Sequence, residues 1–298
     1  MKCQCARNPT VCPRSNQRVN TGTLGAWLQS GQTSLATSGE HLSALYAITE
    51  SVLAKPASWQ IAHPEHPLSK KEEEILVSRL TRLLAGEPLP YITTKQSFFG
   101  REFAVNPSVL IPRPETELMV EQTISAAKQK NNRIHIADVG TGSGCIAVTL
   151  AKEISNCSIF ASDVSGAALR TAAQNAAAHG VSERVSFVQC DLLSAFSGPF
   201  DIVCANLPYI PRAALSQLAV TRHEPILALD GGEDGLQVIS ALLEDLDRIR
   251  GPRCSVFCEI EETLATQFIA LIHSYFPAAS VKIECDLAGR DRIGVVQF

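Results

Sequence analysis

The chain has no excess of basic residues and no long uninterrupted apolar run. Its 298 residues carry a formal net charge of −4 with a pI near 6.0, so it lacks the basic field of proteins whose main task is to grip the nucleic-acid backbone. No apolar run reaches the ~18 residues that a membrane helix needs, and residues 1–18 lack the apolar core of a signal peptide. We therefore expect a cytoplasmic protein with no membrane partner, and a local basic face stays open.

A fourth metal ligand is missing beside the cysteine-rich start of the chain. Cys3, Cys5 and Cys12 have neither a further Cys nor a His nearby, which is a poor match to tetrahedral zinc, so we assign no metal. The other seven of the ten cysteines stand singly in or beside apolar runs, which indicates buried, reduced thiols. These are Cys145, Cys157, Cys190, Cys204, Cys254, Cys258 and Cys285.

The part of the chain before residue 96 divides into two segments. Residues 1–22 are polar without periodicity, which favours a disordered extension. Residues 23–95 show apolar residues at helical spacing, and Ser69 with Glu72 forms a capping box before the last of these helices. This segment is a helical N-terminal domain. It serves either packing alone or the binding of a macromolecular substrate, and both readings stay open.

Residues 96–113 read as a β-hairpin linker into a helix. Phe98 and Phe103 are separated by Gly100, as in two short strands joined by a turn. Pro112 and Pro114 then bracket Arg113 and hold its backbone extended. The segment is an ordinary helix start, or it holds Arg113 rigidly over a ligand.

Residues 114–298 alternate strand and helix in the manner of a doubly wound α/β sheet. A short AGRD connection joins the last two strands, so they must pair antiparallel. We predict seven strands, at 134–139, 158–162, 185–190, 200–205, 254–260, 280–287 and 292–298, with helices from 165 to 180 and from 236 to 250.

The stretch from Ile134 to Gly144, IHIADVGTGSG, carries the strongest local signal. A strand breaks into glycines at alternate positions, 140, 142 and 144, before a helix. Such a loop can take positive φ and bring a ligand close to the free N–H groups of the helix. A dinucleotide fingerprint needs a small residue where Cys145 stands, so the pattern fits NAD poorly. Asp163 ends the next strand, where it can accept hydrogen bonds from both hydroxyls of an adenosine ribose.

The strand at 200–205 runs into Asn206, Leu207, Pro208 and Tyr209. An Asn-x-Pro turn is unremarkable on its own, but this one falls at the same sheet edge as the glycine loop. The Asn206 side-chain oxygen and the Leu207 carbonyl can accept both N–H bonds of a planar NH₂ group. Pro208 stiffens the turn, and Tyr209 offers a flat face to that group.

These motifs resemble those of S-adenosylmethionine (SAM)-dependent methyltransferases of class I, with their seven-stranded Rossmann-like domain. NLPY resembles the N-P-P-Y motif of amino-methyltransferases. The surroundings resemble the release factor glutamine methyltransferase family over roughly residues 84–298. The matching stretches are GEPLPYI (86–92), FFG (98–100), LIPRPETEL (110–118), DVGTGSG (138–144), NLPYIP (206–211), LALDGGEDGL (227–236) and DLAGRDR (286–292).

The resemblance implies methyl transfer from SAM to the side-chain N5 of the glutamine in the GGQ loop of bacterial class I release factors. It implies a protein partner. From the acidic balance and the absent basic stripe we expect no direct nucleic-acid binding, and we expect a monomer. The implied SAM contacts are Gly140, Thr141, Gly142, Ser143, Gly144, Asp163, Asp191, Leu192 and Asn206. The implied acceptor contacts are Asn206 through Tyr209, with Asn206 and Tyr209 as catalytic residues.

The sequence departs from the family pattern at two positions. Leu207 replaces the usual first proline, and Thr94 stands where glycine usually follows YIT. Because N-[IL]-P-Y is also typical of ribosomal-RNA adenine dimethyltransferases, an N6-adenine methyltransferase acting on rRNA or DNA is the alternative. A non-catalytic SAM-binding interaction protein is the second alternative, and the intact glycines and Asn206 argue against it.

Overall fold

The computed structural model describes residues 22–36, 39–130 and 132–298, which form two compact units that divide after Gly86. The expected disordered extension and the three cysteines at positions 3, 5 and 12 lie outside the described residues. No helix in these three ranges is long and apolar enough to cross a membrane.

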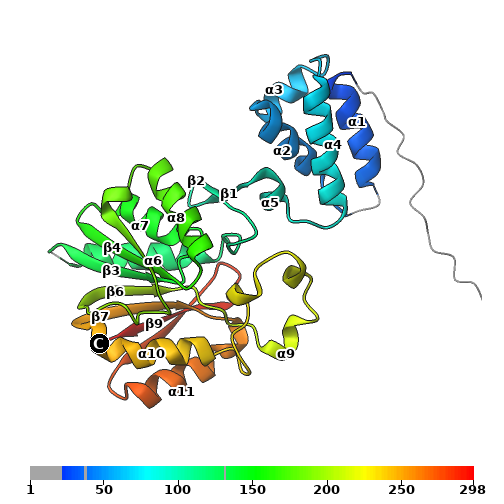
Figure 1. The fold of residues 1–298 in the computed structure, drawn as a ribbon. Coiled ribbons are helices and arrows are strands. Elements are labelled where there is room, and N and C mark those ends of the chain that lie inside the picture. The colour runs from blue at the N-terminus through cyan, green and yellow to red at the C-terminus, as the bar shows by residue number, and fades with distance from the viewer. Residues whose placement is uncertain (1–21, 37–38, 131) are drawn as a thin grey trace, which may run out of the picture. The chain divides into compact units, whose positions relative to one another are not determined.

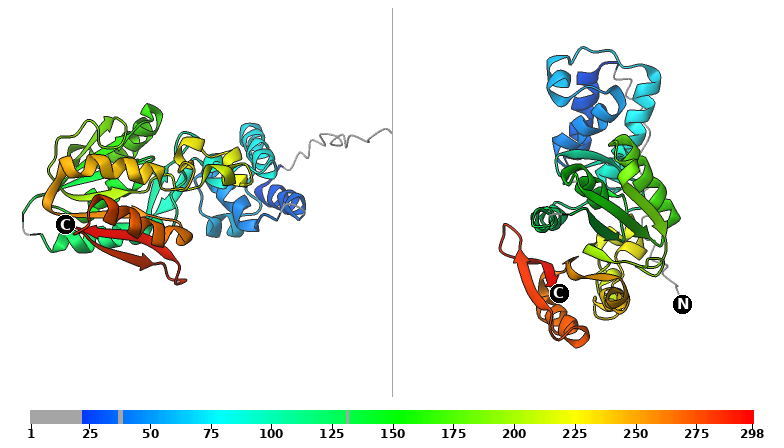
Figure 2. Two further views of the ribbon diagram at one scale, coloured as in Figure 1. Left: turned by 90° about the horizontal axis from the view of Figure 1, so that it is seen from below. Right: turned by 90° about the vertical axis from the view of Figure 1, so that its left-hand side faces the viewer.

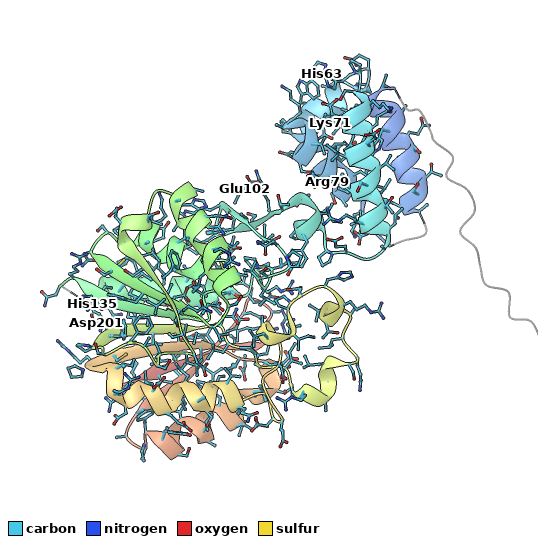
Figure 3. All side chains as sticks on the ribbon, viewed as in Figure 1. His63, Lys71, Arg79, Glu102, His135 and Asp201 are labelled. Atoms are coloured by element: carbon cyan, nitrogen blue, oxygen red, sulfur yellow. The ribbon has the colours of Figure 1, made fainter. Side chains whose placement is uncertain are left out.

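The first unit is helical. It contains α1 (Leu24–Leu35), α2 (Leu42–Leu53), α3 (Ala57–Ala62) and α4 (Lys70–Leu84) (Figure 1). Trp27, Ile48 and Leu76 are buried at its centre. The predicted capping box is confirmed, because the Ser69 hydroxyl accepts from the Glu72 backbone N–H at 3.3 Å and the Glu72 carboxylate accepts from the Ser69 N–H at 2.7 Å. Figure 3 shows Lys71 and Arg79 on α4.

The second unit begins with α5 (Leu89–Thr93), β1 (Lys95–Phe98) and β2 (Arg101–Ala104). The sequence placed the end of the helical domain at residue 95, whereas the compact units divide before α5. The reason is the packing of Tyr91, which lies in a buried cluster with Val109 and Ile111. Its hydroxyl donates to the Val109 carbonyl at 2.6 Å.

The remainder of the second unit is built on a seven-stranded sheet in the order β5-β4-β3-β6-β7-β9-β8. The strands are β3 (Ile134–Val139), β4 (Cys157–Asp163), β5 (Val185–Gln189), β6 (Phe200–Ala205), β7 (Arg250–Glu259), β8 (Ser280–Cys285) and β9 (Asp291–Gln297). β9 pairs antiparallel with both β7 and β8, and the other neighbours pair parallel. The predicted fold and its antiparallel terminal hairpin are confirmed.

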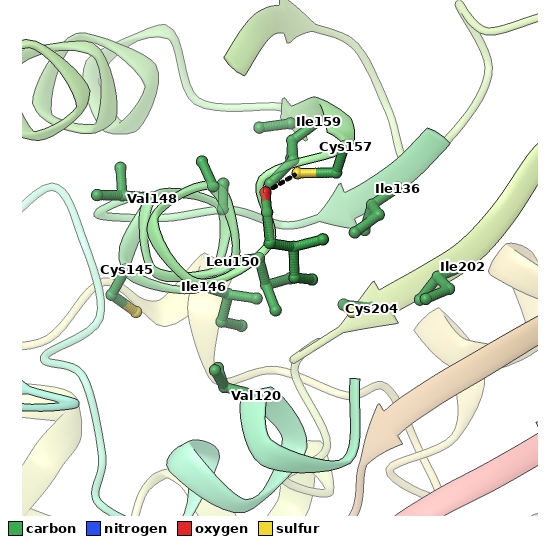
Figure 4. Packing of buried hydrophobic residues seen from close by; sticks show 14 of the residues in the cluster. Val120, Ile136, Cys145, Ile146, Val148, Leu150, Cys157, Ile159, Ile202 and Cys204 are labelled. Carbon is green, nitrogen blue, oxygen red and sulfur yellow. Dashed lines mark hydrogen bonds between the residues drawn. The ribbon is translucent and has the colours of Figure 1, made fainter. Parts of the chain in front are cut away.

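Helices cover both faces of this sheet (Figures 1 and 2). One face packs against α6 (Thr116–Lys128), α7 (Cys145–Glu153) and α8 (Gly166–Ala178), and the other packs against α10 (Gln237–Ile249) and α11 (Ala265–Tyr275). Side chains alternate along each strand, so Ile202 faces α7 while Val203 faces α10. Figure 4 shows Ile146 and Leu150 of α7 in the first of these cores.

The segment between β6 and α10 was left unassigned by the sequence. It forms α9 (Arg212–Leu215) and two short 3₁₀ turns, η2 (Ala219–Arg222) and η3 (Ile226–Ala228). Two further 3₁₀ turns, η1 (Ser182–Arg184) and η4 (Glu262–Leu264), precede β5 and α11.

The cysteine prediction is confirmed at five positions and is wrong at one. The seven cysteines of the described residues are free thiols, and those at 145, 157, 204, 254 and 258 are buried. Cys190 is half-buried. Cys285 is exposed because β8 is an edge strand, and its thiol donates to the Asp291 carboxylate at 3.3 Å.

Candidate active site

A cavity of about 440 Å³ lies at the carboxyl ends of β3, β4 and β6. The strand order reverses at β3, whose neighbours are β4 on one side and β6 on the other. The connections from such neighbouring strands turn to opposite faces of the sheet and leave a crevice between them, which is where doubly wound folds bind ligands. The opposite edge of the sheet carries the contact of His135 with Asp201 (Figure 3).

The glycine loop forms one wall of the cavity. The three glycines have φ values of 71°, 55° and 78° in chain order, a region that favours glycine. A Cβ on Gly140 would lie 3.1 Å from a methyl carbon of Leu207, whereas a Cβ on Gly142 would meet nothing closer than 4.0 Å. Gly140, Thr141, Gly142 and Ser143 line the cavity.

Gly144 is a predicted cofactor contact that the cavity does not reach. It is absent from the cavity lining, and a Cβ there would lie 2.9 Å from the Cβ of Ala172 on α8. Its glycine character therefore serves the close packing of α7 against α8.

Asp163 lies in the cavity wall at the end of β4. Its Oδ2 accepts from the Gly142 N–H at 2.9 Å, and its Oδ1 accepts from the Ser165 N–H at 2.8 Å. A carboxylate has about four acceptor sites, so each oxygen retains capacity toward a ligand hydroxyl. Burial raises the pKa of this carboxyl above its usual value. Asp191 and Leu192 line the same cavity.

Asn206 reaches the cavity from the end of β6 with its amide group held in place. Its Nδ2 donates to Thr116 Oγ1 at 3.0 Å and to Glu259 Oε2 at 3.0 Å. Within the described part of the chain no hydrogen bond engages Oδ1 of Asn206. The amide oxygen is therefore available as an acceptor. Leu207 and Pro208 also line the cavity.

Glu259 is the last residue of β7 and accepts hydrogen bonds from three side chains, the first of them Asn206. It is 2% exposed, and it also accepts from the Thr116 hydroxyl at 2.6 Å and from the Tyr209 hydroxyl at 3.2 Å. Burial is the main cause that raises the pKa of its carboxyl. Sequence reasoning missed Glu259 and Thr116, although an acid that ends an apolar strand at the ligand edge was a usable signal.

Tyr209 is a predicted site residue that is not among the residues lining the cavity. Its hydroxyl is used by Glu259. Burial raises the pKa of its phenol.

The glycine-rich stretch at 231–235 braces the turn that carries Asn206. A Cβ on Gly231 would lie 2.7 Å from the Tyr209 Cα, and a Cβ on Gly235 would lie 2.5 Å from the Tyr209 carbonyl oxygen. The Gly231 N–H also donates to the Ile210 carbonyl at 2.9 Å. Side chains at these two positions would push the turn out of place, which gives the GGEDGL motif a physical reason.

An ion pair joins two walls of the cavity. Arg113 lines it and pairs with Glu224, which is buried and also accepts from the Ile111 N–H at 3.1 Å. Pro225 and Leu227 follow Glu224 and line the cavity too. The pair ties the segment between β6 and α10 to the segment before α6.

Comparisons with known proteins show what this chain is similar to. The family model described as methyltransferase small domain matches residues 115–223, and the one described as PrmC N-terminal domain matches residues 26–93. A release factor glutamine methyltransferase of Nitratidesulfovibrio vulgaris is 41% identical over 73% of this chain and 75% of its own length. One of Bradyrhizobium diazoefficiens is 32% identical over 94% of this chain and 95% of its own length.

The fold also has a match among solved structures. A methyltransferase from Pyrococcus furiosus has a TM-score of 0.50 at 18% identity, over 74% of this chain and 98% of that one. At this identity the match supports the fold alone.

Proposed function

This chain belongs to the release factor glutamine methyltransferase family, and we propose on that basis that it transfers a methyl group from SAM to a glutamine side chain of a peptide chain release factor. The proposed acceptor atom is N5 of the glutamine in the GGQ loop of bacterial class I release factors. In this proposal the N-terminal helical domain binds the substrate. The hairpin links it to the domain that catalyses the transfer.

The observation that supports this proposal best is the hydrogen bonding of the Asn206 amide. Its nitrogen is fully used inside the protein, by Thr116 and Glu259, so its oxygen is the atom offered to a ligand. An acceptor glutamine amide needs two hydrogen-bond acceptors in its plane. Asn206 Oδ1 and the Leu207 carbonyl are our candidates, and together they would fix the direction of the amide lone pair.

The residues around the cavity fit SAM. Asp163 keeps acceptor capacity for ribose hydroxyls, the Gly140–Ser143 wall has no Cβ at Gly142, and the volume falls in the range of small-molecule sites. When bound, SAM supplies a sulfonium whose methyl group is intrinsically electrophilic. We assign Gly140 through Ser143, Asp163, Asp191 and Leu192 to binding it, and Asn206 through Pro208 to the acceptor.

The protein contributes to methyl transfer by aligning the acceptor amide with the methyl group of SAM. An amide nitrogen is a weak nucleophile because its lone pair is delocalised, so positioning contributes much of the rate, and well-oriented reactants can gain about 7–11 kcal/mol. Asn206 would hold the acceptor nitrogen and the cavity walls would exclude water. A cytoplasmic monomer that does not bind nucleic acid directly is part of the same proposal.

Mass spectrometry of a release factor treated with this protein and SAM tests the assignment. We expect the mass gain of one methyl group on the GGQ glutamine. A gain on another residue, with the GGQ peptide unmodified, would contradict the proposed acceptor.

A further inference from the structure

Glu259 lies behind the acceptor site, where no motif places a functional residue. Its carboxylate accepts from Asn206, Thr116 and Tyr209, at 3.0, 2.6 and 3.2 Å. One buried carboxylate thus contacts both the first and the last residue of the NLPY turn. It also holds Thr116 at the start of α6.

Glu259 and Thr116, the two hydrogen-bond partners of the Asn206 amide nitrogen, both act as acceptors toward it. Both Glu259 oxygens act as acceptors, Oε2 from Asn206 and Thr116 and Oε1 from Tyr209. Thr116 has a single hydroxyl proton, and that proton goes to Glu259 at 2.6 Å, so toward Asn206 its oxygen acts as an acceptor. Two acceptors facing one end of an amide select the nitrogen for that end.

This selection matters because an asparagine amide has two rotamers of similar intrinsic energy. The terminal torsion of Asn is broad and roughly two-fold. A rotation by about 180° about that torsion would place Oδ1 against the Glu259 carboxylate and present an NH₂ group to the cavity. An NH₂ group cannot accept from a glutamine amide, so the flipped form cannot align the substrate.

We infer that Glu259 is a positioning residue for methyl transfer: through its own carboxylate and through Thr116 it locks the Asn206 amide with Oδ1 toward the acceptor. This inference rests on the proposed function and concerns how that site is kept competent. Glu259 need not touch SAM or the glutamine for its loss to stop alignment.

Two substitutions at residue 259 and a neighbouring control test the inference. Glu259→Gln keeps an oxygen for Asn206 and Thr116 and can donate to the Tyr209 hydroxyl, whereas Glu259→Leu removes every acceptor. Cys258→Ala changes the adjacent buried residue of β7, which packs in the core on the opposite face. Each variant is checked for folding by circular dichroism, and SAM affinity is measured by calorimetry.

We expect Glu259→Leu to lower kcat for release factor methylation by about 100-fold, the scale of loss from misplaced reactants, with SAM affinity within about three-fold. Glu259→Gln should restore kcat to within about ten-fold of wild type, and Cys258→Ala should match wild type. A folded Glu259→Leu protein with wild-type kcat would overturn the inference, and so would a loss explained by weaker SAM binding.

A double-mutant cycle separates positioning from general structural support. If Glu259 acts through Asn206, then Glu259→Leu should change kcat by less than about two-fold in an Asn206→Ala background, because coupled residues are not additive. Full additivity would overturn the inference. If Glu259→Leu does not fold, Thr116→Val serves in the same cycle, with the same expected non-additivity and the same contradicting result.

Different outcomes would refute the positioning role of Glu259 and the proposed function. A wild-type protein that fails to methylate any release factor would refute the proposed function. Wild-type methylation with no effect of Glu259 and Thr116 substitutions would refute the positioning role alone.

Discussion

Asn206 donates from Nδ2 to the Glu259 carboxylate at 3.0 Å although the two residues are 53 positions apart. The contact follows from strand pairing, since β6 and β7 are parallel neighbours and Ala205 lies opposite Cys258. The residues that come next in each strand therefore meet at the carboxyl edge. The sheet places an acid beside the amide that the proposed chemistry needs.

Asn206→Ala should separate cofactor binding from methyl transfer. The substitution removes the proposed acceptor of the glutamine N–H and leaves the glycine wall and Asp163 unchanged. We expect SAM affinity within a few-fold of wild type and a fall of two or more orders of magnitude in kcat, because alignment is lost. Calorimetry and a methyl-transfer assay measure the two quantities, and equal losses in both would show that Asn206 has another role.

The fold could be predicted from the sequence because local signals agreed with one another. Apolar runs bounded by glycine and proline marked the strands, and the short AGRD connection at 288–291 left the terminal pair no parallel route. The capping box at Ser69 marked the start of α4 to the residue. These features depend on neighbours within a few positions, which a single sequence displays.

The hydrogen-bond network behind the site could not be predicted in the same way. Thr116 and Glu259 are 143 positions apart, and nothing in their spacing indicates contact. Tyr209 was expected to offer its ring face to the ligand, and nothing in the sequence indicates that its hydroxyl donates to Glu259. Gly144 fits a ligand motif, yet its missing Cβ is explained by Ala172. Such details depend on tertiary packing.

Asp163→Ala should weaken SAM binding. It removes the proposed charge-assisted bonds to the ribose and also frees the Gly142 N–H that Asp163 accepts from. Hydrogen bonds to charged groups contribute about 1.5–3 kcal/mol, so we expect a loss of about 10- to 100-fold in SAM affinity by calorimetry. Asp201→Ala, at the opposite edge of the sheet, is the matched control and should bind SAM like wild type (Figure 3). Equal affinity in Asp163→Ala and its control would contradict the ribose assignment.

The effect of Asp138→Asn on the free energy of unfolding should be more favourable at pH 8 than at pH 5. Asp138 is fully buried, its Oδ2 accepts from Thr141 and from the Ala147 N–H, and burial raises the pKa of its carboxyl to about 6. Between about pH 4 and pH 6 the Asp138 carboxyl is therefore protonated in the native state and ionised in the unfolded state. Wild-type stability from this group is present below about pH 4 and is lost as the pH rises through about 6.

Asparagine cannot ionise, so it escapes this loss. We expect the difference in unfolding free energy, variant minus wild type, to be more favourable at pH 8 by about 1 kcal/mol. Urea unfolding at the two pH values measures it. A difference that is independent of pH would show that Asp138 titrates normally in the folded protein.

Thr94→Gly should stabilise the second unit. Thr94 is at φ 63°, a left-handed conformation that is strained for a β-branched residue and ordinary for glycine. After the larger entropy cost of ordering glycine, we expect a gain of about 0.5–1 kcal/mol in unfolding free energy. Ala177→Gly, at an exposed position in α8, is the control and should instead cost about 1 kcal/mol. A loss of stability in Thr94→Gly would mean that its hydroxyl bond to the Thr93 carbonyl outweighs the strain.

The most direct test of the proposed function is a competition between protein and nucleic-acid acceptors for labelled methyl groups. The protein is incubated with methyl-labelled SAM, a purified class I release factor, ribosomal RNA and DNA, and the label on each is counted. We predict label on the release factor alone, and its complete loss when the GGQ glutamine is changed to alanine. Label on RNA or DNA with none on the release factor would contradict the account.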